Sequence, residues 1–161
     1  MASALQAPIQ TKEFMSWFKK KTPSSTDEAP QVNIPEKPLL ISVDFDGTCV
    51  EHKYPAIGKT MPGCVETLQA LVLRDHKLIL WTCREDSQEH PDQIYLSDAV
   101  QWFKDNEIPI VGVNETPLDL DFRPEGGGKV YADMYIDDTN FGGFPGWHKI
   151  HYTLTGMPLI C

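Results

Sequence analysis

The chain has 161 residues, of which 41% are hydrophobic and 23% are charged, and these values are ordinary for one soluble globular domain with a possible tail. Its net charge of −9 argues against a non-specific nucleic-acid binder, although it does not exclude an enzyme that meets a phosphate through a metal ion. The longest apolar runs, PLLISV and KLILWTC, are far shorter than the roughly 20 residues of a membrane span, and no secretion signal is visible. We therefore expect no stable membrane insertion and a cytoplasmic location.

Residues 1–38 are expected to form a disordered or partly helical N-terminal arm. They hold five of the 13 prolines, and the stretch TPSSTDEAP has no apolar periodicity. One exception is TKEFMSWFKKK, where a short capped helix would place Phe14, Trp17 and Phe18 on one face. Such a basic amphipathic segment suits a membrane surface or a partner, but it also suits docking on its own chain, because a helix this short is marginal alone.

Residues 39–161 alternate between predicted strands and predicted helices. Short continuous apolar runs predict the strands, whereas apolar residues at helical spacing predict the helices. In chain order the predicted elements are a strand at 38–44, a helix at 62–77, a strand at 77–82, a helix at 91–106, strands at 108–114 and 132–138, and a helix at 146–154. This alternation predicts an α/β domain, built as a three-layer Rossmann-like parallel sheet with helices on both faces.

Acidic and hydroxyl side chains gather where the predicted strands end. The first strand ends in Asp44-Phe45-Asp46-Gly47-Thr48, the second in Thr82-Cys83-Arg84, and the fourth in Asp137-Asp138. In parallel sheets the chemistry gathers at these carboxyl ends, so four carboxylates would converge and repel one another. A hard divalent cation removes that repulsion, and oxygen ligands without a nearby His or Cys favour Mg²⁺. The alternative for DFDGT taken alone is an ordinary turn after a strand.

Over about residues 39–150 the sequence resembles the haloacid dehalogenase-like (HAD) phosphatase superfamily. The motifs that carry this resemblance are ISVDFDGT, LILWT, a lysine and YIDD. The resemblance implies that Asp44 is a nucleophile that forms an aspartyl-phosphate. It makes Asp46 the general acid/base, whose backbone carbonyl would also reach the metal. Gly47 would allow a sharp turn, and Thr48 would help to hold the loop.

The remaining motifs of the family complete the expected site. Thr82 would hydrogen-bond the phosphoryl group, and Asp137 would ligate Mg²⁺, with Asp138 close by or acting through water. The lysine of the third motif is best matched by Lys129, eight residues before Asp137, although Lys149 on the other side of the acids is an alternative. These groups would position the phosphoryl group and neutralise its charge. For Arg84, a contact with substrate and a surface ion pair both stay open.

The spacing of the motifs leaves no room for a separate cap domain, since 38 residues separate Asp44 from Thr82 and 47 separate Thr82 from Lys129. The family folds a small flap after its first motif, and here it would carry His52 and Tyr54 near a leaving group. An uncapped site suits a macromolecular phosphoester, or a small molecule covered by a second subunit of a homo-oligomer. The long loop at 117–128 is the local candidate for shaping specificity.

The resemblance thus predicts a Mg²⁺-dependent phosphatase that hydrolyses a phosphomonoester of a small molecule or a macromolecule. The acidic charge disfavours nucleic acid as substrate without excluding it. One alternative is a phosphotransferase or a nucleic-acid-end phosphatase. The other is a non-catalytic HAD-like module that binds a partner, since a fold alone does not imply an activity.

Overall fold

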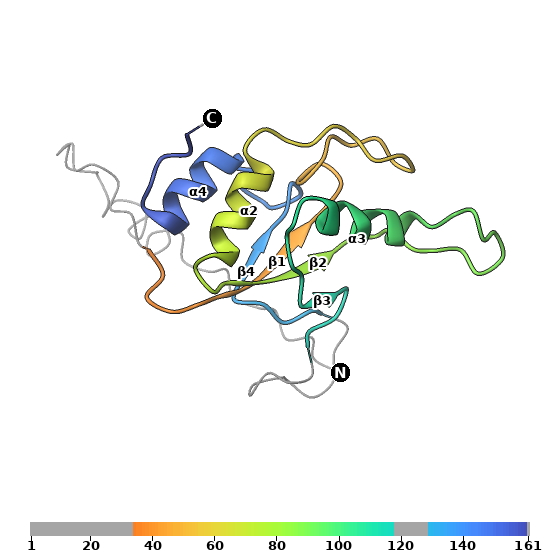
Figure 1. The fold of residues 1–161 in the computed structure, drawn as a ribbon, viewed down its shortest axis with the longest axis horizontal. Coiled ribbons are helices and arrows are strands. Elements are labelled where there is room, and N and C mark those ends of the chain that lie inside the picture. Colours follow the sequence, from red (N-terminus) through yellow and green to blue (C-terminus); the bar gives the residue numbers. More distant parts are fainter. Residues whose placement is uncertain (1–33, 118–128, 161) are drawn as a thin grey trace, which may run out of the picture. The chain divides into compact units, whose positions relative to one another are not determined.

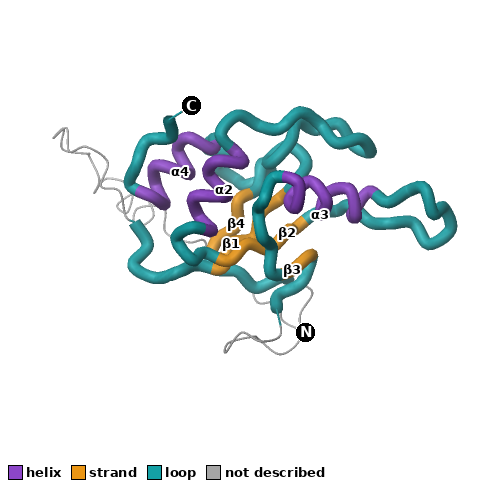
Figure 2. Tube along the Cα trace, viewed as in Figure 1, coloured by secondary structure: helices purple, strands orange, loops and turns teal. Residues whose placement is uncertain are grey.

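A computed structural model describes residues 34–117 and 129–160 of the chain (Figure 1). Nearly all of the predicted N-terminal arm, and the loop at 118–128, lie outside the described residues. The elements are β1 (Leu40–Asp44), α2 (Cys64–Val72), β2 (Lys77–Trp81), α3 (Tyr95–Asp105), β3 (Gly112–Val113), β4 (Met134–Ile136) and α4 (Trp147–Thr155) (Figure 2). None of the described helices is long and apolar enough to cross a membrane.

The four strands form one sheet in the order β3-β2-β1-β4, and every pairing is parallel. Asp44 is in register with Trp81 of β2, and Val43 is in register with Ile136 of β4. Strand β1 therefore lies between β2 and β4, so its acidic end is next to the acidic pair that follows β4. The predicted parallel α/β fold is confirmed, and this strand order brings the distant motifs to one edge.

Each strand buries alternate side chains on opposite faces, as the period of two requires. Ile41 and Val43 of β1 belong to a core that also contains Leu78 and Leu80 of β2, and all four are fully buried. The buried side chains of α2, α3 and α4 join this same core. Burying one such aliphatic side chain contributes roughly 1.5–3 kcal/mol. Since this face buries more apolar side chains than the other, it supplies most of the hydrophobic stabilisation of the described residues.

The second face of the sheet is covered differently. Leu40 and Ile79 pack there against Val130 and Ala132, which belong to the connection from β3 to β4. Among the described residues this face carries no helix, and residues 118–128 of the connection are not described. A helical layer on this face stays a prediction, whereas the expected lack of a separate cap domain holds for the part of the chain that the structure describes.

Two helices are shorter than the sequence pattern predicts, and each has an identifiable cause. Helix α2 ends at Val72 because the chain turns at Asp75, whose φ of 64° is left-handed. Helix α3 begins only at Tyr95, where the Asp86 carboxylate accepts hydrogen bonds from the backbone N–H groups of Leu96 and Ser97 at 2.9 and 3.0 Å. A side chain 10 and 11 residues upstream of these two N–H groups thus provides the N-terminal cap, and a pattern of apolar spacing does not reveal it.

Candidate functional site

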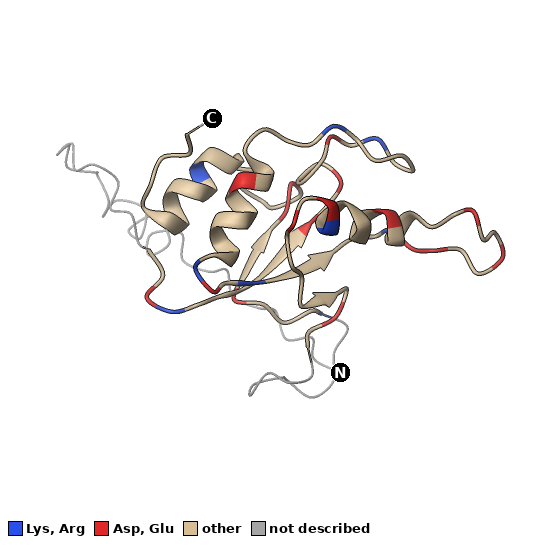
Figure 3. Ribbon diagram, viewed as in Figure 1, with Lys and Arg blue, Asp and Glu red and all other residues tan. Residues whose placement is uncertain are grey.

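Three carboxylates meet at the carboxyl edge of the sheet. Asp44 is the last residue of β1, and Asp137 and Asp138 directly follow β4. One oxygen from each of the three lies within 4.8 Å of the others, which is close enough for one ion to bind all three. Figure 3 shows acidic residues where β1 ends and along the loop between β2 and α3. The structure thus brings together three of the four carboxylates that the sequence assigned to a metal.

Thr48 ties the two acidic segments together. Its fully buried side chain donates a hydrogen bond of 2.7 Å to Asp44 Oδ2, and its Oγ1 accepts one of 3.0 Å from the backbone N–H of Asp138. Its backbone carbonyl accepts a further bond of 2.8 Å from the indole N–H of Trp147. The side chain of Thr48 therefore fixes the orientation of Asp44 relative to the loop after β4.

Gly47 lets the first loop approach the second. Its φ of 92° is left-handed, and a Cβ on this residue would collide with the carboxylate of Asp138. The expected turn is therefore present, and the contact with Asp138 is a second reason why glycine occupies this position.

The environment of Asp44 makes its charged form costly. Burial raises the pKa of Asp44 from its ordinary value of 3.8 to about 6, and the nearby Asp137 and Asp138 add to this rise, while the hydrogen bond from Thr48 opposes it. A bound cation would reverse this balance. The cluster consists of hard oxygen donors alone, so the residues fit Mg²⁺ or a similar hard divalent ion.

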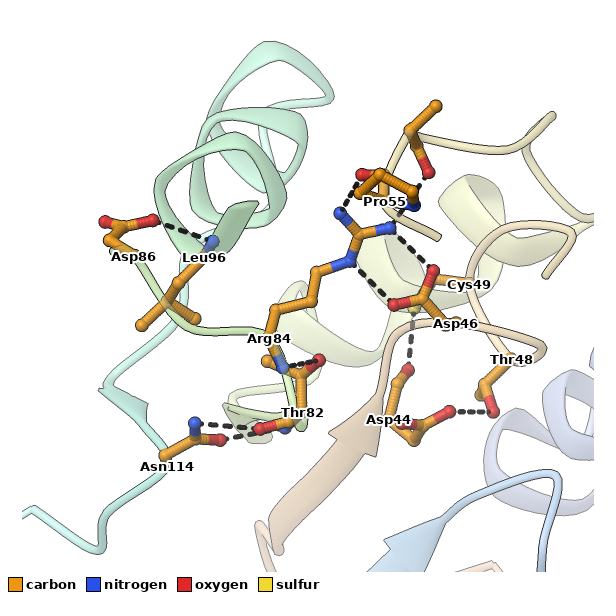
Figure 4. Close-up of polar contacts among 11 residues, drawn as sticks. Asp44, Asp46, Thr48, Cys49, Pro55, Thr82, Arg84, Asp86, Leu96 and Asn114 are labelled. Carbon is orange, nitrogen blue, oxygen red and sulfur yellow. Dashed lines mark hydrogen bonds and ion pairs between the residues drawn. The ribbon is translucent and has the colours of Figure 1, made fainter. Parts of the chain in front are cut away.

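The side chain of Asp46 points away from this cluster and toward Arg84 (Figure 4). Arg84 Nε and Nη2 donate hydrogen bonds of 2.6 and 2.7 Å to the two carboxylate oxygens, which is the paired geometry favoured by a guanidinium. Arg84 is only 1% exposed, so the ion pair is buried rather than superficial. In this structure the guanidinium thus faces protein acceptors, and the expected contact of Arg84 with substrate stays a prediction.

Thr82, the expected hydroxyl at the phosphoryl group, follows β2 and is held by a residue that the sequence reasoning did not single out. The side chain of Asn114 accepts a bond of 2.8 Å from the backbone N–H of Thr82 and donates one of 2.9 Å to its carbonyl. Asn114 has a left-handed φ of 54°, which Asn tolerates better than most residues. In the sequence, the signal that could have identified Asn114 was its position directly after β3, at the carboxyl edge of the sheet.

The two candidate lysines have different surroundings. Lys129 is exposed, its Nζ lies 4.7 Å from the centre of the Tyr135 ring, and among the described residues it forms no ion pair with the three clustered aspartates. Lys149 of α4 lines an apolar cavity of about 270 Å³, which Ile136 and Asp137 also line. The assignment of the third-motif lysine to Lys129, with Lys149 as the alternative, therefore stays a prediction.

The expected flap is the segment 51–59, closed at its base by the hydrogen bonds of Glu51 N–H to the Lys59 carbonyl and of Met61 N–H to the Cys49 carbonyl. Tyr54, which is half-exposed, packs edge-to-face on Tyr95 of α3, with 5.4 Å between ring centres. His52 is exposed as well, so both flap residues are accessible to a ligand.

A comparison with solved structures finds a conserved protein coded by a locus from Bacteroides thetaiotaomicron. The two chains are 37% identical, the match covers 72% of this chain and 88% of the other, and the TM-score is 0.61. No family model matches the chain, and no curated protein matches it. The likeness therefore supplies a relative with the same fold, and the chemistry has to be argued from the site.

Proposed function

We propose that this chain, which belongs to the same family as the conserved protein from Bacteroides thetaiotaomicron, is a Mg²⁺-dependent phosphatase of the capless HAD type. The observation that carries the proposal is the convergence of Asp44, Asp137 and Asp138 at the end of a parallel sheet. Two carboxylates lie beside the partly buried Asp44, whose pKa is raised by burial, and a bound cation would offset the repulsion among the three. The DFDGT and YIDD motifs add the resemblance to the HAD superfamily.

In the proposed reaction, an oxygen of Asp44 attacks the phosphorus and the bond from phosphorus to the ester oxygen breaks. Asp46 gives a proton to the departing oxygen, so the first product leaves as an alcohol. Water then attacks the phosphorus of phospho-Asp44 and gives a proton to Asp46, the bond from phosphorus to the Asp44 oxygen breaks, and inorganic phosphate leaves. When bound, Mg²⁺ supplies positive charge beside the phosphoryl oxygens.

The other residues hold the reacting groups in place. Thr48 fixes the orientation of Asp44 through its hydroxyl, and the Asn114 side chain fixes the backbone of Thr82. Thr82 would hydrogen-bond a phosphoryl oxygen. Phosphoryl transfer depends mainly on such positioning and on charge stabilisation, which makes these supporting contacts relevant to the rate. The substrate is a phosphorylated small molecule or macromolecule, and the site lacks a cap of its own within the described residues.

Phosphate release from para-nitrophenyl phosphate tests the proposal, measured with Mg²⁺ or with EDTA and compared between the wild type and Asp44→Asn. We expect release that requires the metal and disappears in the variant, because the amide cannot form the covalent intermediate. Glu66→Gln, on the exposed side of α2, is the matched control and should retain full activity. If a broad panel of phosphoesters gives no release that depends on Asp44, the protein is not a phosphatase.

A further inference from the structure

The guanidinium of Arg84 is almost completely enclosed by protein. Besides the two bonds to Asp46, Nη1 donates a hydrogen bond of 2.8 Å to the carbonyl of Pro55, and Nη2 donates one of 3.0 Å to the carbonyl of Ala56. Its Cζ lies 5.2 Å from the centre of the Phe45 ring and 5.3 Å from that of the Tyr54 ring. Four of its five N–H groups are thus used, which leaves little of the side chain for a substrate phosphate.

These contacts join the DFDGT loop to the tip of the flap. Asp46 belongs to the loop after β1, whereas Pro55 and Ala56 lie at the tip of the flap. Figure 4 shows the guanidinium between Asp46 and Pro55. The base of the flap is closed by its own backbone hydrogen bonds, but its tip is mostly exposed and rests on the Arg84 side chain and on Tyr95. Arg84 is therefore the polar link between the flap tip and the carboxylate of Asp46.

The backbone of Arg84 extends the same link to the third part of the site. Its N–H donates a hydrogen bond of 3.2 Å to Thr82 Oγ1. Arg84 thus contacts the end of β2, the DFDGT loop and the flap at once. A lysine could keep the positive charge but not the planar fork, because its single ammonium group cannot bind both carboxylate oxygens and two carbonyls in this geometry.

We propose that Arg84 is a positioning residue, which fastens the tip of the flap to Asp46 and thereby holds the Asp46 carboxylate at the leaving-group side of the site. This inference rests on the proposed phosphatase activity, in which Asp46 handles the proton of the leaving group. In the first step Asp46 is protonated on the oxygen that gives up its bond to Arg84 and contacts the leaving oxygen, while the other oxygen and the flap carbonyls keep the guanidinium in place.

Two aryl phosphates separate positioning from substrate binding, both assayed with Mg²⁺. Phenyl phosphate needs a proton for its basic leaving group, whereas dinitrophenyl phosphate does not. For Arg84→Lys we expect kcat/KM, which reports the first displacement, to fall about 10- to 100-fold on phenyl phosphate but less than about threefold on dinitrophenyl phosphate. KM for phenyl phosphate should change less than about twofold. Arg74→Lys is the matched control, since this partly buried arginine just after α2 donates its side-chain hydrogen bond, at 3.4 Å, to the Thr155 carbonyl, and kcat/KM on both esters should stay unchanged.

A double substitution tests whether Arg84 acts through Asp46. In an Asp46→Asn background, Arg84→Lys should cause no further loss on phenyl phosphate, because the group that it positions has already been disabled. An equal loss of kcat/KM on both esters would overturn the proposal, and so would a rise in KM with kcat unchanged, which is the signature of a direct substrate contact.

Trypsin cleavage after Lys53, followed by mass spectrometry, tests the fastening without any need for activity. Lys53 is exposed on the flap, and cleavage there requires the flap to open. We expect cleavage to be at least about fivefold faster in Arg84→Lys and in the nearly isosteric Asp46→Asn, and unchanged in Arg74→Lys. An unchanged rate in both site variants contradicts the proposal. If the wild type shows no turnover that depends on Asp44, the phosphatase function fails, and the cleavage rates alone decide the role of Arg84.

Discussion

Thr48 and Asp138 are 90 residues apart in the chain, yet the backbone N–H of Asp138 donates a hydrogen bond of 3.0 Å to the Thr48 hydroxyl. The same hydroxyl donates to Asp44, so one buried group joins the acid of β1 to the acidic loop after β4. The candidate metal cluster is thus assembled by a specific long-range contact and not by the strand order alone.

Thr48→Val should destabilise the protein and weaken the site. The substitution preserves the shape of the side chain but leaves the N–H of Asp138 without its acceptor, and an unpaired buried group costs about 1–3 kcal/mol. Urea unfolding measures the change in the free energy of unfolding. Thr48→Ser, which restores the hydroxyl, should recover most of the loss. If valine and serine behave alike, the hydroxyl is not what holds the two segments.

Asp44 should make the metal-free protein less stable as the pH rises. Because burial raises the pKa of Asp44 from 3.8 to about 6, the folded protein binds this proton more tightly than the unfolded chain does. The resulting loss of stability develops between these two pH values and is complete above the higher one. In EDTA, the difference in free energy of unfolding between Asp44→Asn and the wild type should therefore increase in favour of the variant across this range.

Mg²⁺ should remove this penalty in the wild type, because the ion favours the ionised carboxylates and binds the folded state. Thermal unfolding at neutral pH should therefore show a rise in Tm on adding Mg²⁺ to the wild type and a much smaller rise for Asp44→Asn. Equal rises for the two proteins would mean that the ion binds elsewhere.

Gly47→Ala should destabilise the protein, because the new Cβ meets the Asp138 carboxylate and a left-handed φ disfavours alanine. The expected cost exceeds about 1 kcal/mol, and the displaced Asp138 should also weaken Mg²⁺ binding. Gly142→Ala is the matched control, since nothing lies within 4 Å of a Cβ there. Isothermal titration with Mg²⁺ and urea unfolding measure the two effects, and similar results for the two alanine variants would argue against the collision.

His76 should cause a loss of stability at acidic pH. Its Nδ1 accepts a hydrogen bond of 2.9 Å from the backbone N–H of Leu39, just before β1, so the folded state requires the neutral ring. Burial lowers the pKa of His76, and the positive charge of Arg74 lowers it further, although Asp75 opposes this. The unfolded chain therefore takes up a proton first, and stability falls as the pH drops below the ordinary value of 6.5.

His76→Asn tests this expectation, because its side-chain oxygen can accept the same bond but does not titrate. The free energy of unfolding of the wild type, measured from neutral to mildly acidic pH, should fall relative to that of the variant. Parallel curves for the two proteins would show that another group carries the acid sensitivity.

The sequence alone determined the elements whose cause is local. The apolar runs that form β1 and β2 are recognisable because a strand buried on both faces needs continuous apolar side chains. The acids at the strand ends and the turn at Gly47 are recognisable as well, because strand, turn and charge follow one another directly in the chain. These features were sufficient to predict a parallel α/β fold and an acidic cluster at its edge.

Only the tertiary structure determined which groups the polar side chains contact. The motif spacing did not reveal that Arg84 binds Asp46 and the flap, or that Asn114 holds Thr82, because each contact joins segments that are more than 25 residues apart. The start of α3 likewise depends on a side chain outside the helix, since the Asp86 carboxylate of the preceding loop caps it from 10 residues upstream. Long-range contacts depend on how the elements pack, and packing is a property of the whole fold rather than of any local pattern.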